Sequence, residues 1–220
     1  MKNKVIGLIP CRLNSTRLKS KVLKKIDIYP LIVHTYKRSL LSKKLDDVYI
    51  CTDSQKIIKE LKKYNCKYIK TRSNFNNGTE RIASVCTRFK AKLIVDIQGD
   101  EPLLNPNDID RVIDFHLKNY NKFDIILPHL PSNKPGTQNT VKIVESNGRI
   151  IFFSRSTVPF PFKKKPIYLK HLSIISFKPK ILKNFLKAGQ SKLEKIESIE
   201  LFRALENNFS IGTFKSFSNS

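Results

Sequence analysis

Lys4-Val5-Ile6-Gly7-Leu8-Ile9-Pro10 is the segment that most narrows the choice of fold, because it is a short apolar run that ends at a proline. Such a run is typical of a strand buried on both faces of a parallel sheet. It leads directly into a loop that carries Arg12, Arg17 and Lys21. Cations at the end of a buried strand can neutralise a polyphosphate, and arginine suits bidentate phosphate contacts. The loop contains no glycine, so it is not a Walker loop, and taken alone it is equally well interpreted as an exposed basic loop.

A second buried-type strand, Leu93–Ile97, is followed by Gln98-Gly99-Asp100-Glu101-Pro102. The carboxylate of Asp100 at a strand end suits Mg²⁺, which takes one or two carboxylates together with substrate phosphates. The alternative is a turn in which Asp100 caps backbone amides. We favour the metal, and the two segments together indicate a nucleotidyltransferase that consumes a nucleoside triphosphate.

Strands and helices alternate along the first half of the chain. We expect strands at 4–10, 47–51, 67–70, 93–97 and 124–127, and helices at 31–40, 55–64, 79–88 and 106–120. This alternation predicts an α/β fold with a mostly parallel, doubly wound sheet flanked by helices. Ligands of such sheets bind outside the carboxyl ends of the strands, so the two polar segments can share one crevice.

The pattern changes after Pro128. We expect a surface loop or lid at 129–138, and a hairpin of 141–144 with 150–154 that turns at Ser146-Asn147-Gly148. Further strands are expected at 169–177 and 209–214, and helices at 179–186 and 193–205. The chain is therefore predicted to be a single domain, 1–220, with a nucleotide-binding half at 1–128 and a β-rich portion at 129–220.

The chain has 220 residues and a formal charge of +24. The lysines are spread over many expected helix surfaces and turns instead of forming one tract with interleaved aromatics, which disfavours nucleic-acid binding. The excess charge would draw anionic substrates toward the site. No run of apolar residues is long enough to span a bilayer, and the cysteines lack metal or redox spacing, so we expect a cytoplasmic protein without membrane insertion.

Three other features have an ordinary structural interpretation on chemistry alone. Asn77-Gly78-Thr79-Glu80-Arg81 could read a base or ribose, but a helix cap explains it as well. A lone histidine in a strand, such as His171, is more often structural than catalytic. Glu194, Glu197, Glu200 and Arg203 recur every three residues, which is also the spacing of a salt-bridged helix surface.

Successive motifs nevertheless resemble one family in their order along nearly the whole chain, the 3-deoxy-manno-octulosonate cytidylyltransferases, or CMP-Kdo synthetases. The motifs are Ile9-Pro10-Cys11-Arg12 with Ser15-Thr16-Arg17-Leu18 and Lys21, Gly78-Thr79-Glu80-Arg81-Ile82-Ala83, Gln98-Gly99-Asp100-Glu101-Pro102, Val141-Lys142-Ile143-Val144, Phe152-Phe153-Ser154-Arg155-Ser156, Lys170-His171 and Leu193-Glu194-Lys195-Ile196-Glu197-Ser198-Ile199-Glu200. The resemblance implies a Rossmann-like nucleotide-diphospho-sugar transferase fold whose later portion serves dimerisation and the sugar site. It also implies the reaction CTP + Kdo = CMP-Kdo + diphosphate for lipopolysaccharide biosynthesis, with Mg²⁺ as cofactor, in a homodimer.

The resemblance also implies roles for particular residues. Arg12, Arg17 and Lys21 would bind the triphosphate, and Asp100 would hold magnesium; of these, Arg12, Lys21 and Asp100 would be catalytic. The remaining roles divide between the two substrates: Thr79, Arg81 and Gln98 for cytidine, and Arg155, His171 and Glu194 for the sugar acid.

The chain departs from the family pattern mainly at the sugar side. A tyrosine of the family is replaced by Ile175, and two glutamines by Lys195 and Leu201; smaller changes are Ser173 and Ser176 for glycines and Asn77 for a serine. Lys195 adds a cation that favours a substrate with an extra acidic group. The family's second magnesium aspartate follows its last strand, and we expect it to be missing because the sequence stops at Ser220. These departures leave two alternatives open: a cytidylyltransferase for another acidic sugar, and a degenerate homologue that binds CTP and dimerises with little turnover.

Overall fold

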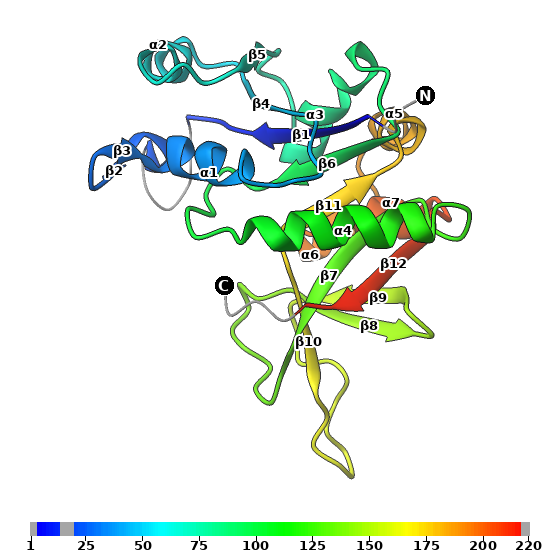
Figure 1. Cartoon of the computed structure of the whole chain (residues 1–220). Helices are drawn as coiled ribbons and strands as arrows, with labels where there is room; N and C mark the ends of the chain where they lie inside the picture. Colours follow the sequence, from blue (N-terminus) through cyan, green and yellow to red (C-terminus); the bar gives the residue numbers. More distant parts are fainter. Residues whose placement is uncertain (1–3, 14–19, 217–220) are drawn as a thin grey trace.

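A computed structural model describes residues 4–13 and 20–216. These residues form one ten-stranded sheet with helices on both faces (Figure 1). The strands of the sheet are β1 (Val5–Pro10), β4 (Asp47–Thr52), β5 (Tyr68–Lys70), β6 (Leu93–Ile97), β7 (Ile125–Ser132), β8 (Lys142–Ser146), β9 (Arg149–Ser154), β10 (Tyr168–His171), β11 (Ile174–Phe177) and β12 (Ile211–Lys215). A separate two-stranded ribbon consists of β2 (Lys25–Ile26) and β3 (Tyr29–Pro30).

The strand order is β10-β8-β9-β12-β7-β11-β6-β1-β4-β5. β1 pairs in parallel with both β4 and β6, and β5 extends this parallel core. β11 then inserts antiparallel between β6 and β7, and the strands beyond it are mostly antiparallel. The predicted α/β fold with a parallel core and a β-rich later portion is therefore confirmed.

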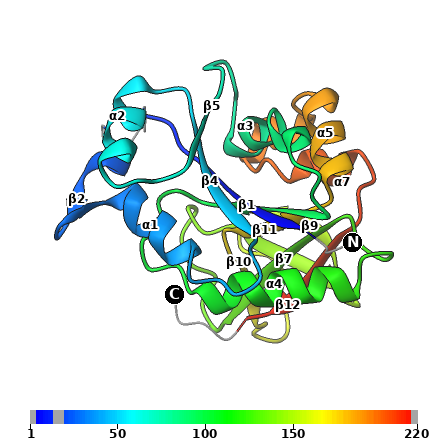
Figure 2. The same cartoon turned by 45° about the horizontal axis from the view of Figure 1, so that its top comes forward.

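The helices are α1 (Leu31–Ser39), α2 (Gln55–Lys63), α3 (Gly78–Ala83), α4 (Pro106–Lys118), α5 (Pro179–Ala188), α6 (Lys192–Glu197) and α7 (Phe202–Glu206), with short 3-10 helices η1 (Lys21–Leu23) and η2 (Cys86–Arg88). Figure 2 shows α1 and α4 on one face of the sheet and α3, α5 and α7 on the other. Within β1, Ile6 and Leu8 pack on the side of the sheet that α3, α5 and α7 cover. Val5 and Ile9 pack on the other side, against α1 and α4. This period of two explains why the run is apolar at both kinds of position.

Four predicted elements differ in their extent. The expected strand 169–177 is two strands, because β10 pairs with β7 and β8 whereas β11 pairs with β6 and β7. The expected helix 193–205 is broken at Ser198, which is left-handed (φ 51°, ψ 45°). The expected helix 79–88 stops after Ala83 and continues only as η2. The expected loop at 129–138 begins late, because β7 runs on to Ser132 along β10.

None of the helices in the described ranges is long and apolar enough to cross a membrane.

Candidate active site

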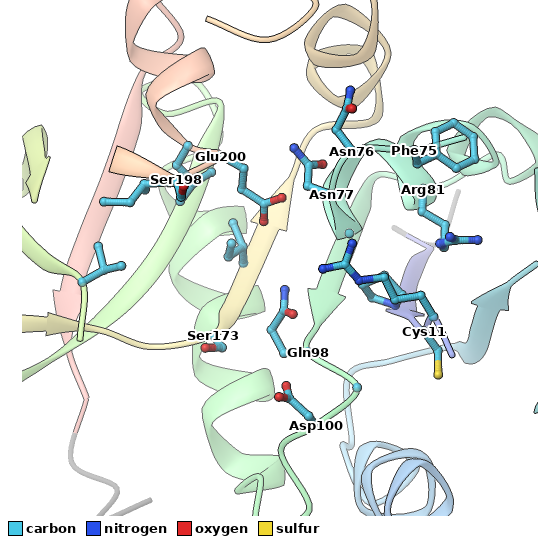
Figure 3. Close-up of a pocket in the computed structure, with 18 of the residues that line it drawn as sticks. Cys11, Phe75, Asn76, Asn77, Arg81, Gln98, Asp100, Ser173, Ser198 and Glu200 are labelled. Atoms are coloured by element: carbon cyan, nitrogen blue, oxygen red, sulfur yellow. The ribbon is translucent and has the colours of Figure 1, made fainter. Parts of the chain in front are cut away.

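A cavity of about 1150 Å³ lies at the carboxyl ends of β1 and β6 (Figure 3). Its wall includes residues that follow both strands, the loop before α3, and part of the segment 190–201. The two polar segments that were predicted to share a crevice are therefore brought together, because parallel strands end at the same edge of a sheet.

Cationic side chains and a carboxylate meet at the β1–β6 end of the cavity. Arg12, Lys21 and Asp100 all line it, and Lys21 Nζ lies 2.8 Å from Asp100 Oδ2. Both partners are accessible, with 38% and 48% of their side chains exposed, so the ion pair is open to exchange with a ligand. Arg17, the third predicted phosphate ligand, lies outside the described residues.

Gly99 lets these two strand ends approach each other. A Cβ atom at this position would lie 3.0 Å from the carbonyl oxygen of Pro10 and 3.1 Å from Ile32 Cδ1. Any larger residue would push the turn that carries Asp100 away from β1, because the backbone carbonyl has little room to yield.

Arg81 is held rigidly beside the cavity on α3. It is only 4% exposed, and its Nη1 lies 2.8 Å from Asp53 Oδ1 and also donates to Thr71. Its guanidinium sits 5.7 Å from the ring centroid of Phe75, which lines the same wall. Asn77 caps the helix by accepting from the Glu80 amide at 2.8 Å. The expected cap is thus present, and it coexists with a cavity wall.

Thr79 does not line the cavity, although it was predicted to contact cytidine. Its hydroxyl donates to Asp96 Oδ2 at 3.2 Å, and its amide donates to Glu200 Oε2 at 3.4 Å. Burial, and then the neighbouring Glu200, raise the pKa of Asp96 well above its usual value. Burial likewise raises the pKa of Glu200, which does line the cavity. Thr79 therefore links two carboxyl groups whose pKa values are both raised by burial, and of the two only Glu200 lines the cavity.

Arg203 is the centre of a buried ion network, whereas the spacing of its neighbours in the sequence was also compatible with a salt-bridged helix surface. The residue is fully buried, and its Nη2 lies 2.7 Å from Glu80 Oε1 and 2.6 Å from Glu194 Oε1. Its Nη1 donates to the carbonyl of Phe185. Asn77 Nδ2 donates to the same Glu194 oxygen at 3.1 Å. The network joins the loop before α3 to α6, so the two walls of the cavity share one counter-ion.

His171 and Glu194, the other two residues predicted for the sugar side, both line the cavity. Glu194 presents little free carboxylate, because Arg203 and Asn77 occupy it and its Oε2 also accepts from the Ser191 amide. Burial lowers the pKa of His171 to about 4, so the ring is neutral. Its Nε2 is buried and has no hydrogen-bond partner among the described residues.

Arg155, which was predicted to face the sugar acid, is not among the residues that line the cavity. Its guanidinium donates to the backbone carbonyls of Glu197, Ser198 and Gln138. Gln98, which was predicted to contact cytidine, lines the cavity.

Sequence reasoning also missed Lys142, which is 1% exposed and donates to the carbonyl of Thr140 at 2.8 Å. It missed Asp96 as well. The only signal for either was a charged residue inside an otherwise apolar strand.

Burial disfavours a cysteine nucleophile at this site. Cys11 lines the cavity, but burial raises the pKa of its thiol to about 12. The reactive thiolate is therefore scarce near neutral pH.

The buried neutral histidine generates a prediction about stability. The ordinary pKa of 6.5 falls to about 4 in the folded chain, so between these values the unfolded chain binds a proton that the folded chain does not. Stability from this group is present above pH 6.5 and is lost as the pH falls toward 4. We expect His171→Asn to reduce the loss of unfolding free energy between pH 7.5 and 5.0, measured by urea denaturation.

The matched control is His34→Asn, because His34 lies on α1 outside the cavity and its Nε2 donates to the carbonyl of Ile26 at 2.7 Å. The His34→Asn variant should lose as much unfolding free energy between pH 7.5 and 5.0 as the wild type. An equal loss in the wild type and His171→Asn would show that His171 does not titrate in this range.

Comparisons with known proteins agree with this geometry. The Cytidylyltransferase family model matches residues 6–211. The 3-deoxy-manno-octulosonate cytidylyltransferase of Fusobacterium nucleatum is 38% identical over 213 residues, which cover 94% of this chain and 86% of that protein. That of Chlorobium limicola is 38% identical over 215 residues, covering 93% and 85%.

A solved structure of CMP:2-keto-3-deoxy-manno-octonic acid synthetase complexed with CTP superposes with a TM-score of 0.92. It is 29% identical, and the match covers 98% of this chain and 90% of that one. The order of strands, the cavity and these likenesses agree: the chain belongs to the cytidylyltransferase family and, within it, to the 3-deoxy-manno-octulosonate cytidylyltransferases.

Proposed function

We propose that the protein transfers CMP from CTP to the anomeric hydroxyl of Kdo and releases pyrophosphate. The observation that carries this proposal is one cavity lined by two chemically different groups of residues. Arg12, Lys21 and Asp100 follow β1 and β6, whereas His171 ends β10 and Glu200 follows α6. The first group suits a triphosphate and the second suits a hydroxylated acid, so an attack of one on the other can occur between them.

The reaction is an in-line displacement at the α-phosphorus. The anomeric oxygen forms the new P–O bond, the bond to the β-phosphate oxygen breaks, and the hydroxyl proton leaves to water or a nearby base. The protein's part is mainly positioning and charge neutralisation. Arg12 and Lys21 would neutralise the phosphates. We assign the same role to Arg17, which is not among the residues that the structure describes. No covalent enzyme intermediate is required.

The donors at Asp100 fit Mg²⁺. Within the described ranges no group of three or more acidic, histidine or cysteine side chains could hold a metal unaided. That agrees with an ion that binds through one or two carboxylates and takes its other ligands from phosphates and water. When bound, Mg²⁺ would supply charge stabilisation on the phosphate oxygens. Lys21 would have to release Asp100 and turn to the phosphates.

The cytidine would lie toward α3. Gln98 and Arg81 line that wall, and Phe75 offers an aromatic edge beside it. In this proposal Thr79 does not contact the base. Its amide binds Glu200, and it thereby helps to position Glu200 for the sugar. Preference for CTP over ATP and GTP follows, because a wall fixed by the Arg81–Asp53 ion pair cannot readily widen for a purine.

The sugar acid would lie against α6 and the start of α7. Glu200 in its neutral form can donate a hydrogen bond and avoids repelling an anion, and neutral His171 can accept or donate at Nε2. With Arg155 engaged elsewhere, Lys195 is the cation that segment 190–201 presents to the cavity. We assign the substrate carboxylate to it.

A cytidylyltransferase for another acidic sugar is the second candidate. Ile175 and Leu201 line the cavity and offer no hydrogen bond to a sugar hydroxyl. A hydroxyl left unpaired against them costs about 1–3 kcal/mol, so a sugar with a different substitution could bind better.

The deciding assay is pyrophosphate release with Mg²⁺, all four nucleoside triphosphates and a set of acid sugars. Turnover that needs both CTP and Kdo supports the proposal. Turnover with CTP and a different acid supports the second candidate. If no acid sugar gives release while CTP raises the melting temperature, the chain is a CTP-binding homologue without this activity.

Asp100→Asn tests the phosphate end. The change removes one charge and almost no volume, and the exposed pair with Lys21 contributes only about 0–1 kcal/mol to stability. We expect metal-dependent turnover to fall about 10²-fold or more with the melting temperature unchanged.

Asp114→Asn is its matched control, because Asp114 forms a similarly exposed 2.8 Å ion pair with Lys44 far from the cavity. Equal metal-dependent turnover in Asp100→Asn and Asp114→Asn would contradict the role that we assign to Asp100.

Lys195→Met tests the sugar end. Loss of a charge-assisted contact to the carboxylate should raise the Michaelis constant for the sugar acid about tenfold, with that for CTP within about twofold. Lys192→Met, on the same helix but outside the cavity wall, should leave both constants unchanged. An unaltered sugar constant in Lys195→Met would remove this assignment.

We also propose a homodimer, in which a second copy covers an apolar surface on β9 and the loop 155–167. Phe160 and Phe162 are 76% and 84% exposed, and Figure 1 shows this loop extending away from the sheet. Ile151 and Ile167 add to the same part of the chain, at 54% and 63%. Exposed apolar groups of this size mark interfaces.

Sedimentation should give a dimer for the wild type and a monomer for the double variant Phe160→Ser/Phe162→Ser. A monomeric wild type would overturn the proposed homodimer.

Because CTP is a nucleotide of the cytoplasm, we propose that the reaction takes place there, and recovery of the protein outside the cytoplasmic fraction would contradict this.

A further inference from the structure

The backbone turns sharply at Ser198, at the edge of the cavity. Ser198 ends α6 in the left-handed conformation, with φ 51° and ψ 45°. Residues with a Cβ atom adopt this conformation at a cost, which surrounding contacts must offset. Ser198 and Glu200 both line the cavity, and Figure 3 shows them on the same side of it. The turn therefore decides where Glu200 lies.

Arg155, which does not line the cavity, binds the backbone of this turn. Its Nε donates to the carbonyl of Glu197 at 2.7 Å, and its Nη2 donates to the carbonyl of Ser198 at 3.0 Å. The two acceptors are the carbonyls on either side of the left-handed backbone angles. The Arg155 amide also donates to Glu197 Oε2 at 2.9 Å. A planar guanidinium fits such a fixed pair of acceptors, whereas an ammonium on a flexible stem does not.

The Arg155 side chain also contacts the loop 137–140, which contributes Asn139 to the cavity wall. Arg155 Nη1 donates to the carbonyl of Gln138 at 3.0 Å, beside the cavity residue Asn139. Lys142 completes this link: its buried Nζ donates to the carbonyls of Thr140 and Arg155. The loop 137–140 and the turn at Ser198 are thus joined through two cations whose acceptors are backbone carbonyls.

We propose that Arg155 is a positioning residue that holds the left-handed turn at Ser198, and that it thereby places Glu200 at the sugar-acid end of the cavity without touching the substrate. The proposal rests on the proposed function for its kinetic consequence, but the conformational part stands on these contacts alone. It also explains why an arginine next to the sugar end contributes no charge to the cavity wall.

A double-mutant cycle tests the proposal. Glycine adopts the left-handed conformation without strain, so Ser198→Gly should stabilise the turn when Arg155 is lost. We expect Arg155→Met to lower kcat/KM for the sugar acid about tenfold in the native background and less than about threefold in the Ser198→Gly background. The Michaelis constant for CTP should not follow this pattern.

Arg155→Lys separates positioning from charge. If Arg155 bound the substrate carboxylate, Arg155→Lys would keep the charge and lose less activity than Arg155→Met, and the loss in Arg155→Met would be the same in both backgrounds. Equal losses in the two backgrounds overturn the proposal. Because a lysine cannot bridge both carbonyls, we expect Arg155→Lys to behave like Arg155→Met and to respond to Ser198→Gly.

Hydrogen exchange gives a readout that needs no substrate. The amides of Phe202 and Arg203 donate to the carbonyls of Ile199 and Glu200, directly after the turn. Their exchange should quicken about tenfold in Arg155→Met and Arg155→Lys, while the amide of Leu182 on α5 keeps its wild-type rate. Unchanged exchange at Phe202 and Arg203 overturns the proposal even if no sugar acid is turned over, so its failure is distinct from failure of the proposed function.

Discussion

The fully buried guanidinium of Arg203 is the constraint around which the site is arranged. A buried charge is tolerated only when it is paired and its hydrogen bonds are satisfied. Here the partners come from two distant parts of the chain, Glu80 on α3 and Glu194 on α6. Burial alone would raise the pKa of Glu80, but the Asn76 amide and the Arg203 guanidinium outweigh it and hold that pKa below its usual value. The pairing therefore fixes the α3 wall of the cavity against the α6 wall.

The electrostatics of the cavity follow from this arrangement. Cations at the open end, with Lys21 and Asp100 both accessible, can exchange partners when a phosphate arrives. Toward α6, Glu194 is paired with Arg203, and burial raises the pKa of Glu200. Both effects reduce the repulsion that an anionic sugar would meet from the acidic residues of this wall. The net charge of +24 has little part in this distinction, because most lysines lie elsewhere on the surface.

Sequence patterns predicted the scaffold well where burial alone decides the structure. The apolar run before Arg12 and the one before Asp100 both became central parallel strands, since such strands must be apolar on two faces. The patterns were less informative where tertiary contacts override local preference. The expected helix 193–205 satisfies helical periodicity, yet it breaks at Ser198, where Arg155 binds the carbonyls on both sides of the break.

Charged residues were the hardest to place from the sequence. A repeat of Glu194, Glu197, Glu200 and Arg203 at every third position is compatible with a solvated surface or a buried network, because the spacing does not show which face meets another charge. Only the position of Glu80, more than a hundred residues away, decides between the two. Resemblance to a family likewise identified Arg155 as important but could not show that its donors point to backbone carbonyls.

The most direct test of this account is the unfolding free energy of Arg203→Met compared with that of the triple variant Arg203→Met/Glu80→Gln/Glu194→Gln, measured in urea. The single change leaves two buried carboxylates without their cation, and we expect it to cost about 3–5 kcal/mol. The triple variant removes those charges as well, so it should recover a substantial part of the loss. A single variant within about 1 kcal/mol of the wild type would contradict the claim that this ion network holds the two walls of the cavity together.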